Sequence, residues 1–512
     1  MLDKKNLLYR RQFVIGPRYV KELNWWNKIP VTDQLFITVH PDLNYAQVKK
    51  GNRSLTLLGY LIDPFKPKFD DTNILEELIS KSNTNDNLIE NCNKYGGRWI
   101  LIFDDSKKIM LFNDPAGLKQ VYYTNNSTIE FWCGSQPNII TMNIQCTFNN
   151  EAYNDLKKSG AFNTSNLYFW PGNSSPYLEI KRLIPNHYLD IDNRLCHRYW
   201  PNKELKGLSL EEGAYKCKEL LKRLIKGVYE RFKLAHAITS GLDSRLLLAA
   251  SKDIARNIYY YTAKRKNFNR LTPDIRIPKE LLKKLSLSHH IIDCSKEMSI
   301  EFREIYENNV MNAHESGGRD AQGFFNNCPS DRISMIGNVS ETVRASPYFD
   351  QSYDLSERYL DINEKLLASK VRMDKSIFAI KNFKIWLKDC INLEKKYGIN
   401  IIDLFYLEQL MGGWLSMIRT ESDIVQEVFT PYNCRLFLEY MFAIDEKYRK
   451  PPEYIIYKKM ILSLWPEVMQ MPVNPVDFIK VTKDLVRKSI KLIAKTTGTY
   501  YLYKFFKSLR NR

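Results

Sequence analysis

The sequence predicts two folded parts of different class: an α+β part with layered sheets over residues 1–200, then an α/β part with a doubly wound parallel sheet over residues 201–482. Three observations support this division. β-rich apolar runs dominate the first 200 residues, as in a layered sheet. A helix with a capping signature opens the second part. Strand and helix patterns then alternate, which is typical of a parallel sheet with crossover helices.

The first part is expected to consist mainly of short strands and turns. One stretch, TNILEELISKS over 72–82, has helical spacing of its apolar residues. The polar turn between 99–105 and 108–114 indicates a hairpin. The runs that we expect to be strands are LFITV (35–39), LTLLGYLI (55–62), WILIFDD (99–105), KIMLFND (108–114), QVYYT (120–124) and TIEFWCG (128–134).

The second part begins with a helix. Ser209 and Glu212 have the spacing of a capping box, so the helix should run from there to about Arg231. The elements expected after it are a strand at 232–238, a tight turn, a helix at 244–252, a strand at 257–263, a helix at 278–286 and a strand at 289–294. From about residue 395 onward, apolar residues recur mainly at helical spacing, which predicts a helical C-terminal region.

Several classes of protein can be set aside. No apolar run reaches the ~18–20 residues that a membrane span needs, and the N-terminal MLDKKNLLYRRQF does not read as a secretory signal. The nine cysteines are scattered without a CxxC pair, and no HExxH occurs, so a structural zinc site or a disulfide framework is not expected. We therefore expect a cytoplasmic protein.

The positive charge is unevenly distributed. Lysine plus arginine is 76 and aspartate plus glutamate is 58, a net of +18. Residues 1–200 hold 24 basic and 20 acidic residues, a net of +4, which leaves +14 for residues 201–512. The last segment, 483–512, holds nine basic residues and one acid, a net of +8. A nucleic-acid partner is not expected, because such enzymes more often carry their charge along a groove of the folded domain.

The tail over 483–512 mixes its basic residues with Leu, Ile, Tyr and Phe. This pattern predicts an amphipathic segment that contacts an anionic membrane surface or an acidic partner, so the protein would be peripheral to the membrane. A merely solvated terminal helix is the alternative, and the sequence leaves both open.

The turn over 238–245, ITSGLDSR, carries the clearest chemical signal. A turn between a buried strand and a helix points backbone N–H groups toward an anion. Gly241 allows a ligand to approach the backbone, and the hydroxyls of Thr239, Ser240 and Ser244 can donate to phosphate oxygens. Asp243 suits Mg²⁺ bound to the same phosphate. The alternative is an ordinary turn with Ser244 as the helix N-cap.

Residues 238–244 resemble the SGGxDS pyrophosphate loop of the PP-loop ATP pyrophosphatases. Further segments, in the same order along the chain, resemble the asparagine synthetase family, which includes the β-lactam synthetases. These segments are FDDSKKIMLFNDPAGLKQVYY (103–123), EIKRLIPNHYLDID (179–192) with Tyr199-Trp200, Thr272-Pro273-Asp274 with LLKKLSLSHHII (281–292), and Glu427 with Pro431-Tyr432-Asn433. The resemblance implies a glutaminase-like domain over 1–200 and an ATP-pyrophosphatase synthetase domain over 201–482.

The first half departs from the family at its nucleophile. Glutamine-dependent members use a cysteine at position two, whereas this chain begins Met1-Leu2 and its first cysteine is Cys92. Of the family's NGExxN segment, only Gly59 is recognisable. We therefore expect a glutaminase-like fold without glutaminase activity, as in the β-lactam synthetases. Nitrogen would come from ammonia, from a separate glutaminase or from an amine of the substrate.

The synthetase half keeps some of the family's site residues and changes others. Its SGExxDE loop aligns with 336–342, where Asn338 replaces a glutamate that orients the nucleophile and Glu341 replaces a metal-binding aspartate. Arg344 is a candidate for holding a phosphate or a carboxylate. Glu427 survives from ExRxPFLD as a candidate general base. For Glu341 and Glu427 an ordinary structural role is the alternative.

Two further features bear on the site. The family places a lysine after its LP segment, but 464–474 contains none; Lys458, Lys459 and Lys480 are candidate substitutes. The insert His314-Glu315-Ser316-Gly317-Gly318-Arg319-Asp320 is a candidate lining of a substrate cleft, with Arg319 facing an anion, or else an exposed loop. The adjacent His289 and His290 are expected at the start of a strand, without a metal.

The resemblance implies an ATP- and Mg²⁺-dependent ligase that activates a carboxylate as an acyl-adenylate and then forms an amide. Expected substrates are small-molecule or glycan carboxylates, as in the tailoring of glycans or natural products. The alternative is a degenerate relative that binds nucleotide or a partner without catalysis. A tRNA-modifying enzyme would suit the charge, but the glutaminase-like first half and the lack of zinc cysteines argue against it.

Overall fold

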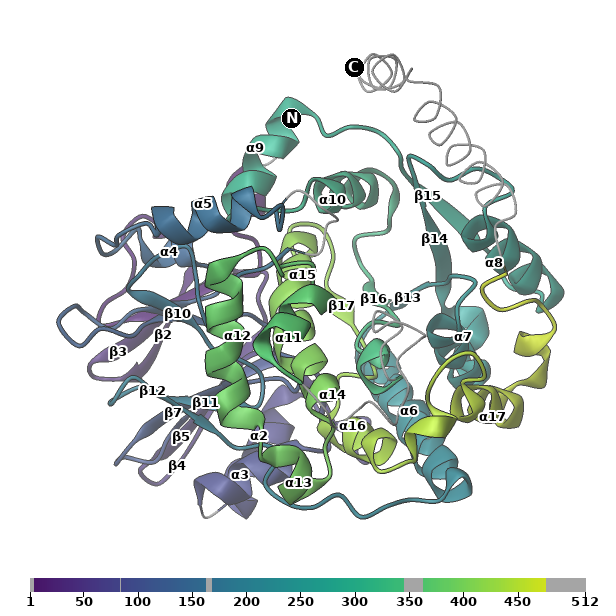
Figure 1. The fold of residues 1–512 in the computed structure, drawn as a ribbon, viewed down its shortest axis with the longest axis horizontal. Coiled ribbons are helices and arrows are strands. Elements are labelled where there is room, and N and C mark those ends of the chain that lie inside the picture. Colours follow the sequence, from purple (N-terminus) through teal and green to yellow (C-terminus); the bar gives the residue numbers. More distant parts are fainter. Residues whose placement is uncertain (1–3, 83, 163–167, 345–361, 476–512) are drawn as a thin grey trace.

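The computed structural model describes residues 4–82, 84–162, 168–344 and 362–475 (Figure 1). The predicted basic tail at 483–512, the N-terminal Met1-Leu2 and Lys480 lie outside the described residues. Antiparallel sheets occupy the N-terminal part of the chain, and a parallel sheet with helices follows, so the two predicted fold classes are present in the expected order.

One antiparallel sheet of six strands has the order β10-β8-β9-β1-β3-β2. Its strands are β1 (Phe13–Gly16), β2 (Asn27–Thr32), β3 (Leu35–Val39), β8 (Tyr122–Thr124), β9 (Cys133–Gly134) and β10 (Ile180–Arg182). The run expected over 35–39 is strand β3. The run expected over 128–134 is a strand only in its last two residues, because its first half forms turns that are held by the side chain of Asn126.

The second antiparallel sheet also has six strands, in the order β12-β11-β7-β6-β5-β4. Its strands are β4 (Tyr45–Lys50), β5 (Arg53–Ile62), β6 (Gly96–Asp104), β7 (Ile109–Asn113), β11 (His187–Asp190) and β12 (Leu195–Arg198). Strands β6 and β7 form the expected hairpin, with Ile100 opposite Asn113.

The two antiparallel sheets pack face to face between layers of helix and loop. Their inner faces share one core, to which the first sheet contributes Ile15 and Ile37 and the second contributes Leu58 and Ile102, all fully buried. The outer face of the second sheet is covered by α2 (Asp71–Lys81) and α3 (Asn85–Cys92). The outer face of the first is covered in part by α4 (Pro137–Ile140). The remaining helices of this part are α1 (Lys4–Leu7) and α5 (Asn150–Lys158).

Gly59 is needed where β5 passes β6. Its φ is +100°, a region that side chains rarely adopt, and a Cβ atom there would lie 2.1 Å from the carbonyl oxygen of Arg98. Gly97 on the facing strand has φ +120° and a Cβ would meet the Tyr60 carbonyl oxygen at 2.2 Å. The two glycines therefore allow the backbones to approach closely at this point of the sheet.

The third sheet has five parallel strands in the order β15-β14-β13-β16-β17. They are β13 (Leu234–Ala237), β14 (Tyr259–Arg265), β15 (His290–Cys294), β16 (Ile333–Met335) and β17 (Val428–Phe429). The helices that accompany them are α6 (Leu210–Arg231), α7 (Leu242–Ala250), α8 (Pro273–Lys284), α9 (Ile300–Asn309) and α10 (Glu315–Asn327), with the 3₁₀ turn η1 (Lys252–Asn257). Helix α6 has the expected N-cap, since Ser209 Oγ accepts from the backbone N–H of Glu212 at 3.2 Å.

The C-terminal region is helical, as its periodicity predicts (Figure 1). It contains α11 (Glu364–Lys370), α12 (Ile377–Cys390), α13 (Leu393–Tyr397), α14 (Ile401–Phe405), the π-helix η4 (Tyr406–Leu415), α15 (Ser416–Ser422), α16 (Arg435–Phe442) and α17 (Ile455–Leu464). Short 3₁₀ turns are η2 (Ser340–Val343), η5 (Glu446–Tyr448) and η6 (Pro466–Met469).

The two parts share a continuous core. Tyr60 of β5 is buried with the residues of α6 and donates its hydroxyl to the carbonyl oxygen of Val428 at 2.8 Å. A second contact between the parts joins α5 and α12, where Asp155 accepts a hydrogen bond from the backbone N–H of Phe378 at 3.0 Å. Contacts of this kind place the first part directly against the C-terminal helices.

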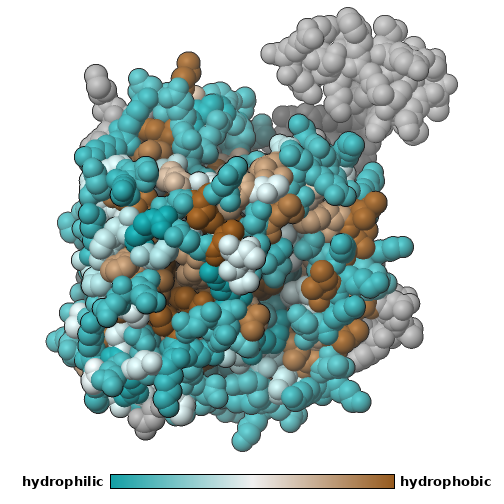
Figure 2. Space-filling view, turned by 90° about the vertical axis from the view of Figure 1, so that its left-hand side faces the viewer, coloured by the Kyte–Doolittle hydropathy of each residue, from teal (hydrophilic) through white to brown (hydrophobic). Residues whose placement is uncertain are grey.

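The surface of the first part is mainly hydrophilic. Figure 2 shows this face, where hydrophobic side chains lie between polar ones. Exposed large hydrophobic residues in this part are Tyr45, Phe65, Leu178 and Leu195. Among the helices in the described ranges, none combines the length and the apolar character that crossing a bilayer requires.

Candidate functional site

The parallel sheet changes its direction of winding at β13. The chain runs from β13 outward to β14 and β15, then returns to place β16 on the other side of β13. In open α/β sheets, ligands bind at the carboxyl ends of the strands beside such a reversal. Here the loop after β13 is 238–241 and the loop after β16 is 336–339. A Cβ on Gly337 would lie 2.9 Å from Cβ of Asp243, so the loop after β16 lies against the first turn of α7, which directly follows the loop after β13.

The loop after β13 is organised by its own hydroxyls. Ser244 Oγ accepts from the backbone N–H of Thr239 at 3.1 Å, and Thr239 Oγ1 accepts from the N–H of Gly241 at 3.2 Å. Ser240 donates both its N–H and its hydroxyl to Asp274 Oδ1, at 3.0 and 2.6 Å. Gly241 is the N-cap of α7, and no side chain caps that helix. Ser244, the N-cap expected in the ordinary-turn interpretation, lies instead inside the first turn of the helix.

Asp243 and Glu341 bring two carboxylates together at the start of α7. Asp243 Oδ1 accepts from Ser340 Oγ at 2.8 Å, and its Oδ2 pairs with Arg344 Nη2 at 3.0 Å. Burial raises the pKa of Asp243, while Arg344 opposes that rise. Burial and the neighbouring Asp243 raise the pKa of Glu341 to about 7. The two acids therefore repel each other, and only one has a strong cationic partner.

The donor set fits a divalent cation. Asn338 Nδ2 donates to Glu341 Oε1 at 3.4 Å, but Glu341 Oε2 is buried without a hydrogen-bond partner. A cation between Glu341 and Asp243 would satisfy that oxygen and relieve the repulsion. Within the described residues no three His, Cys, Asp or Glu side chains gather as an all-protein metal cage. This suits Mg²⁺, which usually takes one or two carboxylates and completes its shell with phosphate oxygens and water.

Both loops open into a cavity of about 510 Å³. Its lining includes most of the polar positions expected from the sequence, which are Thr239, Asp243, Ser244, Asn338 and Glu341. Another wall comes from the start of α10, from η4 and from α15, and includes His314, Trp414, Ile418 and Arg419. The backbone at Val339 has φ +75°, a rare conformation for a β-branched residue, and such outliers cluster at functional sites.

Glu427 lies apart from this lining. Its carboxylate pairs with Arg98 Nη1 at 2.8 Å and with Arg11 Nε at 3.6 Å, both from the N-terminal part of the chain. The residues that line the cavity include its neighbour Val428 but not Glu427 itself. The observed contacts therefore place Glu427 in an ion-pair cluster between the two parts, and its role as a general base stays a prediction.

Arg319, Lys458 and Lys459 also lie outside the lining. Residues 315–320 form the first turns of α10 rather than a loop, because apolar and small residues on that helix pack against β15 and α15. Arg319 pairs with Glu297 at 3.2 Å on the outer side. Lys458 and Lys459 on α17 pair with Glu453 and Glu211, at 2.9 and 3.0 Å. The expectation that Arg319 faces an anion in the cleft is therefore not met by these contacts.

The lining includes four residues of the insert that was a candidate cleft lining, His314, Ser316, Gly317 and Asp320, together with Arg419, which the sequence did not single out. His314 is 1% exposed and its Nδ1 lies 2.7 Å from Glu421 Oε1. Arg419, one turn before Asp423, forms no ion pair among the described residues. The predicted insert at 314–320 contains His314. No sequence signal connected His314 with Glu421, because the two residues are far apart along the chain.

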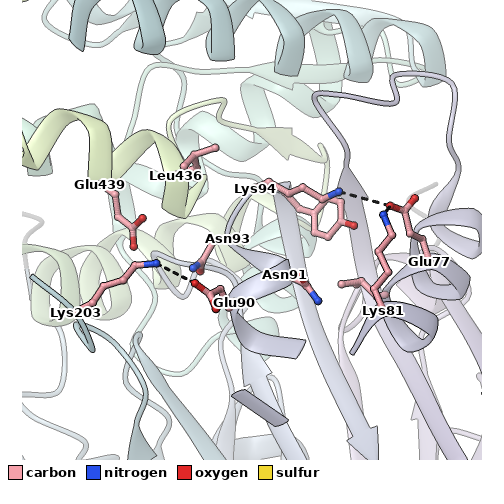
Figure 3. Close-up of a pocket in the computed structure, with 11 residues that line it drawn as sticks. Glu77, Lys81, Glu90, Asn91, Asn93, Lys94, Lys203, Leu436 and Glu439 are labelled. Atoms are coloured by element: carbon pink, nitrogen blue, oxygen red, sulfur yellow. Dashed lines mark hydrogen bonds and ion pairs between the residues drawn. The ribbon is translucent and has the colours of Figure 1, made fainter. Parts of the chain in front are cut away.

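A second pocket, of about 300 Å³, lies between the first part and α16 (Figure 3). Its walls carry both lysines and glutamates, and each of the lysines forms an ion pair with one of the glutamates. Lys203 lies 3.0 Å from Glu90, and Lys94 lies 4.0 Å from Glu77. Because its charges neutralise one another, this pocket presents no unpaired cation comparable with Arg419.

Comparisons with known proteins give weak likenesses only. No protein-family model and no curated protein matches the chain. A solved glutamine phosphoribosylpyrophosphate amidotransferase from B. subtilis, complexed with ADP and GMP, is 12% identical, with 65% of this chain and 77% of that chain covered and a TM-score of 0.24. The allosteric regulatory enzyme of purine biosynthesis is 14% identical, with 60% and 76% covered and a TM-score of 0.23.

TM-scores this low support no conclusion about the fold, the site or the function of this chain.

Proposed function

We propose that the chain is an ATP-dependent amide-forming ligase that resembles asparagine synthetase. The observation that carries the proposal is the position of loop 239–244. It lies at the reversal point of a parallel sheet and carries Asp243 close to Glu341. It also opens into a cavity large enough for a small ligand. In this proposal residues 201–482 form the synthetase domain, residues 1–200 a glutaminase-like domain without glutaminase activity, and 483–512 a separate basic tail.

The N-terminus of α7 and the hydroxyls of Thr239 and Ser244 would bind the phosphates of ATP. Asp243 and Glu341 would hold Mg²⁺, which supplies positive charge to the departing pyrophosphate. Asn338 donates to Glu341 and would keep its carboxylate oriented. Arg344, which now neutralises Asp243, would be a candidate to contact a phosphate oxygen of ATP.

The proposed reaction has two steps. A substrate carboxylate oxygen attacks the α-phosphorus of ATP, forming an acyl-adenylate as the α–β bridge breaks and pyrophosphate leaves. The nitrogen of ammonia or of a substrate amine then attacks the acyl carbon, AMP departs, and the excess proton of the nitrogen passes to a base. The substrate would be a small-molecule or glycan carboxylate, and the nitrogen would come from outside the first domain.

Two contacts favour the second candidate, a nucleotide- or partner-binding protein without catalysis. The donors of Ser240 are already taken by Asp274, and Asp243 is already paired with Arg344. The expected lysine has no equivalent on the cavity wall among the described residues.

A pyrophosphate-release screen separates the two candidates. ATP and Mg²⁺ would be incubated with the full-length chain and a panel of amino acids, uronic acids and peptides. The ligase proposal predicts release with at least one carboxylate and at least about a hundredfold less release from Asp243→Asn, which removes a charge that acts on the leaving group. If no carboxylate elicits release while ATP still binds, the non-catalytic candidate is correct.

A further inference from the structure

Arg419 is an unneutralised cation on the wall of the cavity. Its Nε atom is buried without a hydrogen-bond partner, and no carboxylate of the described residues pairs with its guanidinium. The other arginine that lines the cavity, Arg265, pairs with Asp320 at 2.8 Å. Burial, together with the nearby charge of Arg98, lowers the pKa of Arg419 to about 10. Arg419 is only partly buried, and a partly buried charge without an ion-pair partner is available to a ligand in the cavity that it lines.

The acids nearest to Arg419 are engaged elsewhere. Asp423 pairs with both terminal nitrogens of Arg98, at 2.7 and 3.0 Å, and with Lys119 at 3.4 Å. Glu421 accepts from the backbone N–H of His314 at 2.9 Å and lies 2.7 Å from its Nδ1. The second oxygen of Glu421, Oε2, has no hydrogen-bond partner, but neither acid lies within ion-pair distance of Arg419, so the guanidinium is left for a ligand.

His314 supplies a second unpaired group on the same wall. When the ring is neutral and Nδ1 donates to Glu421, Nε2 carries the lone pair, and that atom is buried without a hydrogen-bond partner. The ring is held in place by stacking on Tyr168, with 4.2 Å between ring centroids, and by Tyr306, whose hydroxyl donates to the His314 carbonyl oxygen at 2.9 Å. The orientation of this acceptor is therefore fixed before a ligand arrives.

We propose that the wall formed by α10 and α15 binds the substrate through a carboxylate held by Arg419 and an N–H or O–H group held by His314 Nε2. Carboxylate binding at this wall is argued from the wall alone. That the bound carboxylate is a substrate of the ATP site rests on the proposed function. A carboxylate, with one charge, matches one guanidinium in a bidentate fork. A phosphate carries about −1.5 to −2 and would leave excess negative charge beside Glu421 and Asp320.

The test measures binding without ATP or Mg²⁺, so it does not depend on catalysis. Sodium succinate and sodium glucuronate serve as carboxylate probes, dimethyl succinate and glucose as their neutral counterparts, and inorganic phosphate as the competing anion. Each is titrated into the full-length chain by calorimetry or by ligand-observed NMR. We expect at least one carboxylate to bind in a way that depends on Arg419, and the neutral counterparts to bind more weakly or not at all. Phosphate that binds at loop 239–244 should not depend on Arg419.

Three variants assign the binding to this wall. Arg419→Gln should weaken carboxylate binding by about tenfold or more, the usual effect of losing one charged hydrogen-bonding partner. Arg419→Lys should retain part of it, because a point charge remains. Arg319→Gln, which removes a neighbouring arginine that faces outward, is the matched control and should bind as the wild type does.

Thermal unfolding gives an independent readout. Removing a partly buried charge that has no ion-pair partner should leave the unfolding midpoint of Arg419→Gln unchanged or higher, whereas a structural arginine would lower it. The inference is wrong if no carboxylate binds the wild-type chain, if Arg419→Gln binds carboxylates as tightly as the wild type, or if Arg419→Gln weakens phosphate binding more than carboxylate binding. Pyrophosphate release that is absent in the screen described above would refute the ligase proposal and leave this binding site intact.

Discussion

Arg98 of strand β6 and Asp423 at the end of α15 form a bidentate ion pair that joins the two parts of the chain. Nη1 lies 2.7 Å from Oδ1 and Nη2 lies 3.0 Å from Oδ2, and both side chains are almost fully buried. Burial alone would lower the pKa of Arg98, but the carboxylates of Asp423 and Glu427 outweigh it and raise that pKa. The N-terminal part is therefore anchored electrostatically to the helices that carry the cavity wall.

Removing this arginine should strongly destabilise the whole chain. Arg98→Ala leaves Asp423 and Glu427 without their main partner in a buried place, which typically costs about 3–5 kcal/mol. Urea unfolding followed by circular dichroism measures the effect. Lys233→Ala, which breaks an exposed pair with Asp331, is the control and should leave the midpoint nearly unchanged. Equal midpoints for the two variants would show that the buried cluster does not hold the parts together.

Replacement of Gly59 by alanine should destabilise the chain far more than replacement of Gly51 by alanine. Both have positive φ, so alanine at either position costs about 1–2 kcal/mol for the backbone conformation. At Gly51 no atom lies within 4 Å of the added Cβ, whereas at Gly59 the Arg98 carbonyl oxygen lies at 2.1 Å. We expect Gly59→Ala to lower the free energy of unfolding at least twice as much as Gly51→Ala. Similar losses would mean that β5 and β6 do not approach as described.

His236 should make the chain sensitive to acid. It is fully buried in β13, neither ring nitrogen has a partner, and burial lowers its pKa to about 3. The unfolded chain takes up the proton near pH 6.5 and the folded chain does not, so stability is full above pH 6.5 and falls between pH 6.5 and about 3.

His236→Leu should therefore gain about 2 kcal/mol relative to the wild type between pH 7 and pH 5, measured as the change in unfolding free energy. His290→Leu, at an exposed position on β15, is the control and should not reproduce that gain. A His236→Leu variant with the same pH dependence as the wild type would contradict the burial of an unpaired imidazole.

Gly337 should be required for nucleotide binding. A Cβ there would meet Cβ of Asp243 at 2.9 Å and the backbone nitrogen of Ser244 at 3.2 Å, so a larger side chain must push the two loops apart. We expect Gly337→Val to weaken ATP binding by about tenfold or more, the effect of about 1.4 kcal/mol, as measured by calorimetry. Gly207→Val, where no atom lies within 4 Å, should bind ATP normally. Unchanged binding by Gly337→Val would place the nucleotide elsewhere.

The sequence predicted most elements whose periodicity or capping is strong. The helix over 72–82, the capped helix after Ser209 and the strand over 35–39 lie where their patterns indicated. Strand 128–134 was predicted too long, because its β-forming residues are held in turns by Asn126. Local patterns report what one segment prefers, and side-chain hydrogen bonds from a neighbouring turn can override them.

The candidate site was predicted less completely than the fold. Loop 239–244 was recognisable because its chemistry lies in consecutive residues. The pair of His314 and Glu421, the free guanidinium of Arg419 and the outward direction of Arg319 depend on how α10 packs against α15. Such relationships between distant segments are set by tertiary packing and leave no spacing in the sequence to detect.

The most direct test of the central claim identifies the products that form from ATP. The full-length chain would be incubated with Mg²⁺, ATP and the carboxylate panel, and the phosphorus-containing products separated and quantified. Attack at the α-phosphorus predicts AMP and pyrophosphate in equal amounts, and their loss in Asp243→Asn. ADP and inorganic phosphate as the products, or AMP and pyrophosphate formed equally well by Asp243→Asn, would contradict the assignment of loop 239–244 as an ATP-pyrophosphatase site.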